Sequence, residues 1–288
     1  MCTQDQVIGM PKVNRRQFAA LGASGALAAC TAIDATGATA SGLTERNVSF
    51  AAPGGYFDGV FIHPAEGKHP AVILWPDIAG LRPAKVMMGR RLAEAGYAVL
   101  VANPYYRSVE GQQFEDFDAW RSSGGFDAVG PWMAKNTPAA IGETAAGVVS
   151  WLDAQDAVDS ARGIGNQGYC MTGSWTIIAA AAVPDRIKAA ASFHGGGLVG
   201  EEANAPVNLL DDMASDAGAI ICIAKNDDAK APTDKEALKA AGDAAAADVS
   251  VEVYQGDHGW TVLDSPVYDE AEAERAWAAL LALYAAKL

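Results

Sequence analysis

From residue 46 to the C-terminus, short and largely apolar runs alternate with longer stretches that have the spacing of amphipathic helices. Short apolar runs of this kind are typical of strands buried on both faces of a parallel sheet. The runs are 71–75, 97–102, 163–169, 187–193, 219–224 and 249–254, and the helical stretches are 83–95, 138–152, 173–182, 233–246 and about 268 onward. This alternation predicts an α/β fold with a mostly parallel, doubly wound sheet and helices on both faces.

Two segments depart from this alternation. The runs 47–52 and 56–63 are separated by a Pro-Gly-Gly turn signal, which predicts an antiparallel hairpin ahead of the parallel strands. The connection 103–136 is rich in Gly, Tyr and Trp. A connection of this length inside a compact domain is usually functional or partly helical, so we expect short helices or a functional loop there.

The chain is acidic, with 35 Asp and Glu against 21 Lys and Arg among 288 residues and a formal net charge of −14. Such a charge repels phosphate backbones and argues against a nucleic-acid partner. The cysteines, which are Cys2, Cys30, Cys170 and Cys222, are too few and too scattered for a disulfide scaffold, and no C-x-x-C pair offers a zinc site. We expect no metal, no cofactor and a small molecule as the partner.

The N-terminus has the layout of a bacterial twin-arginine export signal. Arg15 and Arg16 precede a weakly hydrophobic run rich in Ala and Gly, from Phe18 to Ala29. A helix needs about 20 apolar residues to cross a bilayer, and this run is shorter than that. It therefore fits a signal better than a transmembrane helix, and we expect an exported protein that is periplasmic or anchored to the membrane as a lipoprotein.

Two processing sites compete in this region. The motif that ends at Cys30 resembles a lipobox, in which that cysteine would carry a lipid anchor. The Ala-Thr-Ala motif that ends at Ala40 resembles an ordinary signal-peptidase site. We predict that residues 1–40 are an export signal and tether, and that residues 41–288 form a single α/β domain.

The segment from Gly168 to Gly173 follows a predicted strand and opens a predicted helix. Its pattern is a variant of the G-x-S-x-G nucleophile elbow, with Cys170 in place of the serine. A tight turn lifts this side chain above the sheet, the helix N-terminus stabilises a thiolate, and the N–H of Met171 points at an oxyanion. The pattern predicts a cysteine nucleophile, although a small buried cysteine is the alternative.

The polar residues that follow have the chain order of a nucleophile–acid–base triad. Two carboxylates, Asp227 and Asp228, follow one late strand, and His258 follows the next. The histidines of the early hairpin region precede Cys170, so chain order excludes them as the base. We predict that His258 takes the proton of Cys170 and that an aspartate orients the imidazole.

Other candidates have weaker support. His194 begins a His-Gly-Gly-Gly run that resembles the oxyanion motif of lipases, but it follows the predicted nucleophile, whereas that motif precedes it. We expect His194 in a strand-end loop near the pocket rim. Cys222 lies within an apolar run and is expected in the core, and Ser174 lies one turn into the helix instead of at the elbow.

The chain is similar to the dienelactone hydrolase family, the Cys-His-Asp branch of the α/β-hydrolases. The resemblance covers nearly the whole body and rests on Arg107, the elbow and the segments 75–81, 256–260 and 266–270. It implies an α/β-hydrolase fold and the hydrolysis of an ester or lactone through an acyl-thioester on Cys170. It also places the oxyanion donors at Ile78 and Met171, and it favours Asp228 as the triad acid.

Departures from the family pattern bear on the substrate. Thr172 stands where Gly is usual, which crowds the elbow, and Asp77 replaces a Glu that contacts the nucleophile and an arginine. We expect Asp77 and Arg107 to keep a weaker version of that pairing. Val262 stands where a second arginine helps to bind a substrate carboxylate. We therefore expect Asp77, Arg107 and Trp260 to contact an ester or lactone that is less charged than dienelactone.

The alternative is a non-catalytic ligand-binding protein on the same scaffold, because a fold does not by itself settle a function. The crowded elbow at Thr172 and the missing arginine at position 262 keep this alternative open. Trapping of an acyl group on Cys170 discriminates the enzyme from the binding protein.

Overall fold

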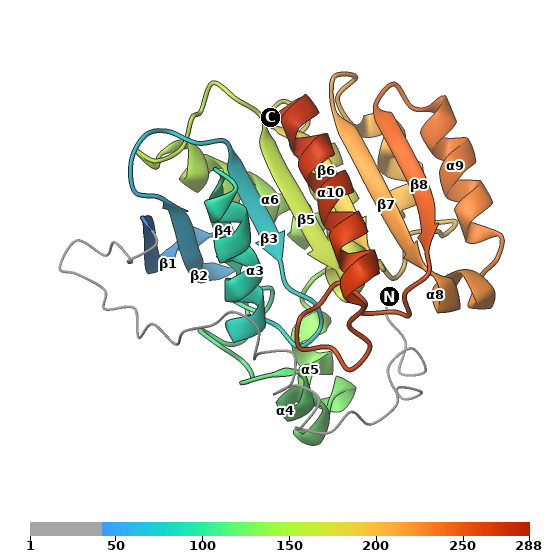
Figure 1. Ribbon diagram of the computed structural model, residues 1–288, viewed down its shortest axis with the longest axis horizontal. Coiled ribbons are helices and arrows are strands. Elements are labelled where there is room, and N and C mark those ends of the chain that lie inside the picture. Colours follow the sequence, from blue (N-terminus) through green and yellow to red (C-terminus); the bar gives the residue numbers. More distant parts are fainter. Residues whose placement is uncertain (1–41) are drawn as a thin grey trace.

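The computed structural model describes residues 42–288, in which eight strands form one sheet. In chain order the strands are β1 (Leu43–Ala52), β2 (Gly55–Pro64), β3 (Ala71–Trp75), β4 (Ala98–Ala102), β5 (Ile164–Tyr169), β6 (Ile187–Phe193), β7 (Gly218–Ala224) and β8 (Asp248–Tyr254). Across the sheet they follow the order β1-β2-β4-β3-β5-β6-β7-β8 (Figure 1). Strands β3 and β5 are therefore central neighbours, and their carboxyl ends meet in the middle of one edge.

The predicted hairpin at the start of the sheet is present. Strands β1 and β2 pair antiparallel, with Pro53 and Gly54 between the paired residues Ala52 and Gly55. Strand β2 also pairs antiparallel with β4, and every other neighbouring pair is parallel. The prediction of a mostly parallel α/β sheet is confirmed.

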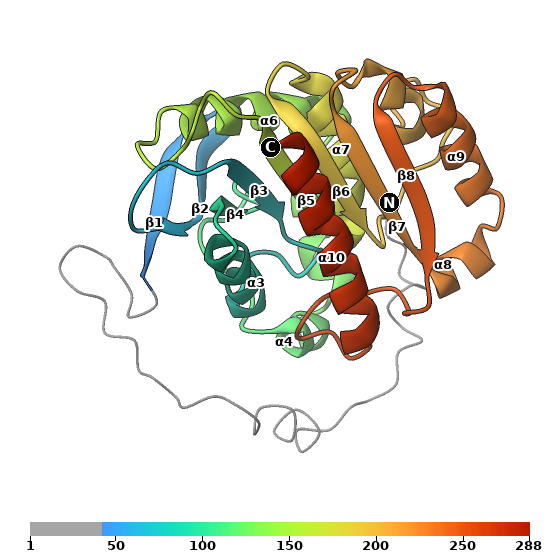
Figure 2. The ribbon, with the colours of Figure 1, turned by 45° about the horizontal axis from the view of Figure 1, so that its top comes forward.

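Helices cover both faces of this sheet (Figure 2). One face carries α3 (Pro83–Glu94) and α10 (Glu270–Lys287), and the other carries α6 (Pro138–Asp153), α7 (Gly173–Ala182) and α9 (Asp234–Ala244). Successive side chains of a strand point to opposite faces, so Ile73 packs in the α6–α7 core and Leu74 in the α3–α10 core. This two-sided burial explains why β3 is apolar throughout.

The long connection after β4 is partly helical, as the sequence predicts. It contains α4 (Phe117–Ser122) and α5 (Phe126–Met133). Both helices lie beyond the carboxyl end of β3, at the lower edge of the sheet in Figure 1. This placement puts the first residue of α4, Phe117, beside the edge at which an α/β protein binds ligands.

The segment after β7 differs from the prediction. Residues that the sequence analysis treated as a turn form a short helix, α8 (Lys225–Lys230). Asp227 and Asp228 lie in its first turn. Carboxylates at a helix N-terminus are stabilised by the helix dipole, which accounts for a helix at this position.

The predicted export signal and the cleavage sites at Cys30 and Ala40 lie outside the described residues. Within residues 42–288, none of the helices combines the length and the apolar character that a bilayer crossing requires.

Candidate active site

Cys170 lies at the carboxyl end of β5 and begins η1 (Cys170–Thr172), a 3-10 turn that leads directly into α7. Its φ angle is +55°, in the left-handed region that residues other than glycine rarely adopt. Backbone strain of this kind persists only where the surrounding structure imposes it, and it is concentrated at functional sites. The segment therefore has the strained strand-to-helix turn of a nucleophile elbow.

Two glycines make room for this turn. A Cβ atom on Gly168 would lie 2.1 Å from the backbone oxygen of Thr172. A Cβ atom on Gly173 would lie 2.4 Å from the Cα atom of Gly195, in the loop that follows β6. Both contacts are with backbone atoms, so neither position accepts a side chain without a shift of the main chain.

Thr172 does not crowd the elbow, contrary to the expectation from the family pattern. Its hydroxyl accepts a hydrogen bond from the amide of Tyr169 and donates one to the carbonyl of Trp75, each at 2.9 Å. The side chain therefore ties the elbow to the end of the neighbouring strand β3. A glycine at this position would lack both hydrogen bonds.

His258 follows β8 and contacts α8 at two points. Its Nδ1 atom lies 2.5 Å from Oδ2 of Asp227, and its backbone amide donates to Oδ1 of Asn226 at 2.8 Å. The imidazole also shares a hydrogen bond with Cys170. The fold thus brings a thiol, an imidazole and a carboxylate into one connected chain of contacts.

The aspartate that contacts His258 is Asp227 and not the predicted Asp228. Oδ2 of Asp228 instead lies 3.0 Å from Nζ of Lys235. The difference follows from helix α8, because neighbouring side chains on a helix point about 100° apart. Only one of two consecutive aspartates can therefore face the imidazole.

The charges around His258 set its protonation state. Burial alone would lower its pKa, but the Cys170 thiolate and the Asp227 carboxylate raise the pKa of His258 to about 10. With its pKa raised in this way, the imidazole of His258 holds its proton at neutral pH.

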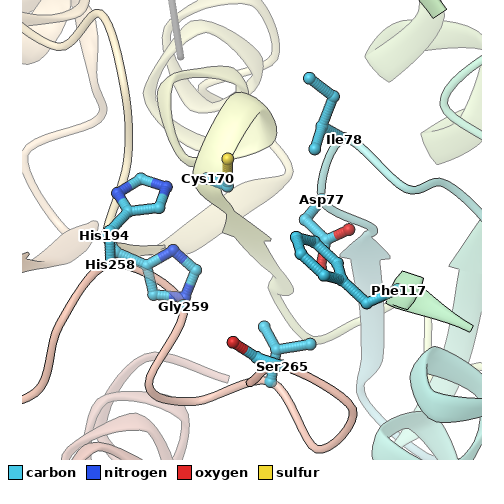
Figure 3. Close-up of a pocket in the computed structure, with 9 residues that line it drawn as sticks. Asp77, Ile78, Phe117, Cys170, His194, His258, Gly259 and Ser265 are labelled. Carbon is cyan, nitrogen blue, oxygen red and sulfur yellow. The ribbon is translucent and has the colours of Figure 1, made fainter. Parts of the chain in front are cut away.

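Cys170 and His258 line a pocket at the carboxyl edge of the sheet. The other residues that line it are Asp77, Ile78, Phe117, His194, Gly259, Val262 and Ser265. Figure 3 shows the two imidazoles on one side of Cys170, with Ile78, Asp77 and Phe117 on the opposite side. Of the two predicted oxyanion donors, Ile78 lines the same pocket as Cys170, and Met171 directly follows Cys170 in the chain.

Asp77 lines the pocket, but its carboxylate is engaged with the start of α3. Arg82 donates to its two oxygens at 2.7 and 2.9 Å, and Nζ of Lys85 lies 2.9 Å from Oδ2. Burial would raise the pKa of Asp77, yet these two cations hold it well below its usual range. Both oxygens of the Asp77 carboxylate are therefore engaged by protein cations in the pocket wall.

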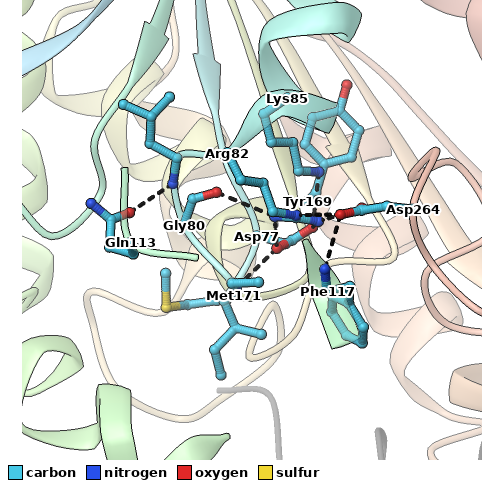
Figure 4. A network of polar contacts seen from close by, with 12 residues as sticks. Asp77, Gly80, Arg82, Lys85, Gln113, Phe117, Tyr169, Met171 and Asp264 are labelled. Carbon is cyan, nitrogen blue, oxygen red and sulfur yellow. Dashed lines mark hydrogen bonds and ion pairs between the residues drawn. The ribbon is translucent and has the colours of Figure 1, made fainter. Parts of the chain in front are cut away.

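Arg82 also binds the loop that follows β8. It donates to the carboxylate of Asp264 at 2.7 and 2.8 Å, and Asp264 accepts the amide of Phe117 at 3.0 Å (Figure 4). We call Asp77, Arg82, Lys85 and Asp264 the Arg82 cluster. It joins the end of β3, the start of α4 and the loop after β8, which all contribute to the pocket wall.

Two further residues that were predicted to contact the substrate lie away from their expected positions. Arg107 does not pair with Asp77, because its guanidinium donates to two groups on α6 at 2.7 and 3.0 Å. Trp260 is fully buried and does not line the pocket. Its ring packs between Tyr254 and His194, with ring centroids 5.2 and 5.0 Å away.

His194 is part of the pocket wall and is not merely a rim residue. It is 1% exposed, its φ angle is +40°, and its Nε2 atom lies 3.0 Å from the hydroxyl of Thr261. Its ring meets that of His258 edge to face, with centroids 4.9 Å apart. The sequence signal for this position is the run of glycines after His194, because glycines allow this loop to approach the elbow closely.

Arg82 and Lys85 were missed by the sequence analysis. A detectable signal exists, because both lie at the N-terminal end of a predicted helix, where the helix dipole disfavours cations. Cations at such a position need a nearby carboxylate. The residues that supply it, Asp77 and Asp264, are distant from each other in the sequence, so only the folded chain identifies them both.

The other sequence candidates have the expected surroundings. Cys222 is buried in β7, and the hydroxyl of Ser174 donates to the carbonyl of Met171.

Over residues 42–288, no group of three or more His, Cys, Asp or Glu side chains could hold a metal ion.

A mostly parallel sheet, a strained elbow after a central strand and a histidine after the last strand together define an α/β-hydrolase. Comparison with known proteins agrees with this class. The model of the dienelactone hydrolase family matches residues 57–288, so the chain belongs to that family.

Individual relatives support the same assignment. A Salmonella typhi protein assigned as a carboxymethylenebutenolidase is 28% identical over 225 residues, covering 77% of this chain and 78% of that protein. A crystal structure from Klebsiella pneumoniae, assigned as a dienelactone hydrolase, has a TM-score of 0.68 at 25% identity and covers 84% of this chain and 98% of its own. An acylaminoacyl peptidase from Pyrococcus horikoshii shares the fold, with a TM-score of 0.58 at 17% identity over 85% of this chain and 42% of its own. The predicted enzyme class, an ester or lactone hydrolase, is confirmed.

Proposed function

We propose that this enzyme hydrolyses small uncharged esters or lactones through an acyl-thioester on Cys170. The observation that carries the proposal is the connected contact from Cys170 through His258 to Asp227, at a residue with a strained φ angle. A relative assigned as a carboxymethylenebutenolidase supports a lactone or ester as the substrate class.

Acylation begins with the thiolate of Cys170 attacking the carbonyl carbon of the substrate. The negative charge moves to the carbonyl oxygen, where the backbone N–H groups of Met171 and Ile78 stabilise it. The imidazolium of His258 then donates its proton to the leaving oxygen as the C–O bond breaks. Asp227 holds the imidazole in the orientation that this transfer requires.

Deacylation uses the same histidine as a base. Acylation converts the thiolate of Cys170 into an uncharged thioester, which removes the largest of the contributions that raise the pKa of His258. The pKa of His258 therefore falls once the acyl group is attached. The neutral imidazole can then accept a proton from the water that attacks the thioester.

The pocket favours an uncharged substrate. Its wall is apolar at Ile78, Phe117 and Val262. The guanidinium of Arg82 is fully buried between the carboxylates of Asp77 and Asp264. A substrate carboxylate would have to displace one of these ion pairs to reach Arg82, so anionic lactones should bind poorly.

The decisive experiment is rapid-quench mass spectrometry during turnover of p-nitrophenyl acetate. The proposal expects an acetyl group on the peptide that contains Cys170, and its absence from Cys170→Ala together with loss of turnover. Turnover that survives this substitution would exclude the cysteine as nucleophile. A matched pair of neutral and carboxylate-bearing esters tests the substrate class, with the higher kcat/KM expected for the neutral ester.

A further inference from the structure

The pocket contains one buried histidine that the acylation steps above leave unused. His194 is 1% exposed, and its Nδ1 atom is buried without a hydrogen-bond partner in any other residue that the structure describes. A buried polar atom without a partner is costly and calls for an explanation, such as a ligand or an ordered water. We infer that Nδ1 of His194 binds the water molecule that hydrolyses the acyl-enzyme. This inference rests on the proposed acyl-thioester.

The orientation of His194 is fixed by its neighbours. Its Nε2 atom is held by the hydroxyl of Thr261 at 3.0 Å, and the ring of Trp260 supports it edge to face. Figure 3 shows the imidazole beside that of His258, on the same side of the pocket. With Nε2 engaged, Nδ1 is the nitrogen available to a molecule inside the pocket.

The position suits the attacking water better than a part of the substrate. In the acyl-enzyme, His258 no longer faces a thiolate, and its Nε2 atom becomes the acceptor for a proton of water. A buried water typically needs two to four polar partners, whereas Ile78, Phe117 and Val262 offer none from their side chains. The ring of His194 lies 4.9 Å from that of His258, so both rings border the space that this water must occupy.

The electrostatic surroundings keep His194 uncharged. Burial lowers its pKa well below the usual value, and the charges of His258 and Lys85 lower it further, against a smaller opposing effect of Asp77. A neutral imidazole offers one hydrogen bond at Nδ1 in either tautomer. It does so without adding a positive charge beside His258, which must itself gain a proton in this step.

The water donates one proton to Nε2 of His258 while its oxygen bonds to the thioester carbon, with His194 holding the water by a hydrogen bond. The tetrahedral intermediate collapses, the C–S bond breaks, and the electron pair returns to the sulfur of Cys170. The products are a carboxylic acid, which ionises into solvent, and the imidazolium–thiolate pair of the resting enzyme.

Two substitutions test the roles of the two ring nitrogens of His194 separately. In His194→Asn, the amide group lies near the position of Nδ1, and asparagine tolerates the positive φ angle found here. In His194→Gln, the longer side chain reaches toward Thr261 and leaves the Nδ1 position empty. Rapid-quench mass spectrometry with p-nitrophenyl acetate measures the rate constants for acylation and deacylation of Cys170 in each protein, and thermal unfolding verifies folding.

The expected result is a deacylation rate about tenfold lower in His194→Gln, with the acylation rate unchanged and the acyl-enzyme accumulating. His194→Asn should deacylate close to the wild-type rate. Equal deacylation in wild type and His194→Gln, or an equal loss in both steps, would overturn the role of His194 while leaving the acyl-thioester intact. Absence of any acyl group on Cys170 in all three proteins would overturn both proposals.

Discussion

Nδ1 of His258 lies 2.5 Å from a carboxylate oxygen of Asp227, whereas the adjacent Asp228 pairs with Lys235. The two aspartates are consecutive on helix α8, yet only the first faces the imidazole. Two side chains of the same type and charge thus have different surroundings. A substitution of one aspartate is therefore the control for the same substitution of the other.

Asp227→Asn should lower kcat by about 10³–10⁴-fold, because an amide no longer holds the imidazole in the required tautomer and no longer stabilises its charge. Asp228→Asn should retain nearly all activity, since that carboxylate binds a partly exposed lysine. Steady-state kinetics with p-nitrophenyl acetate provide the comparison. A comparable loss in the two variants would contradict the assignment of Asp227.

The pH dependence of acylation follows from the protonation of His258. Its pKa is raised to about 10, so the proton that the leaving group needs persists through neutral pH and is lost as the pH rises toward 10. We expect kcat/KM for acylation to fall on the alkaline side near this value. An alkaline limb near pH 6.5, the ordinary pKa of histidine, would be the contrary result.

NMR titration tests the raised pKa of His258 directly. The Cys170 thiolate makes the largest contribution that raises the pKa of His258, so Cys170→Ala should lower this pKa, as followed by NMR titration of the imidazole. Asp227→Asn should lower it as well. His194 serves as the internal comparison, because its own pKa lies well below the usual value. An unchanged His258 titration in Cys170→Ala would show that no thiolate faces the ring.

The Arg82 cluster should be important for stability. Arg82→Met leaves Asp77 and Asp264 without their shared guanidinium, and the loss of one partner from a buried ion pair typically costs about 3–5 kcal/mol. The control is Arg91→Met, which removes an exposed pair with Glu274 and should change the free energy of unfolding by less than about 1 kcal/mol. Urea denaturation measures both values, and similar values would contradict a structural role for the cluster.

The elbow should not tolerate a side chain at position 168. In Gly168→Ala, the new Cβ would lie 2.1 Å from a backbone oxygen, so we expect a loss of at least about 2 kcal/mol of stability and of most activity. Gly130→Ala is the control, because its Cβ would meet no atom within 4 Å apart from its chain neighbours and the helix backbone. The gain from replacing a helical glycine is offset by the contact with the following Pro131, so stability should change by less than about 1 kcal/mol. Wild-type stability of Gly168→Ala would show that the turn is less tight than described.

How much of the fold and of the site could be predicted from the sequence depended on how far apart along the chain the interacting residues lie. Cys170 was predicted from residues within three positions of it, because a nucleophile elbow is a local turn with a fixed spacing. His258 was found from chain order, since each strand of a parallel sheet delivers its following loop to the same edge. The resemblance favoured Asp228, whereas Asp227 contacts His258. The choice depends on where helix α8 begins and on how it is rotated.

Other contacts around the pocket were not predicted from the sequence. Arg107 was expected beside Asp77, but Arg82 is only five positions from Asp77 and binds it directly, while its other partner, Asp264, is 182 positions away. His194 was expected at the rim, and its inward orientation depends on a φ angle of +40° and on Thr261. No pattern within a single segment encodes the contacts with Asp264 and Thr261.

The order of apolar and polar residues was enough to predict the sheet, the elbow and the histidine, since periodicity and turn spacing depend on neighbours in the sequence. Which carboxylate faces the imidazole, which distant carboxylate shares Arg82 with Asp77 and how a second imidazole comes to border the pocket were decided by packing. Those contacts join segments that are far apart along the chain, and their directions are set only when helices and strands settle against one another.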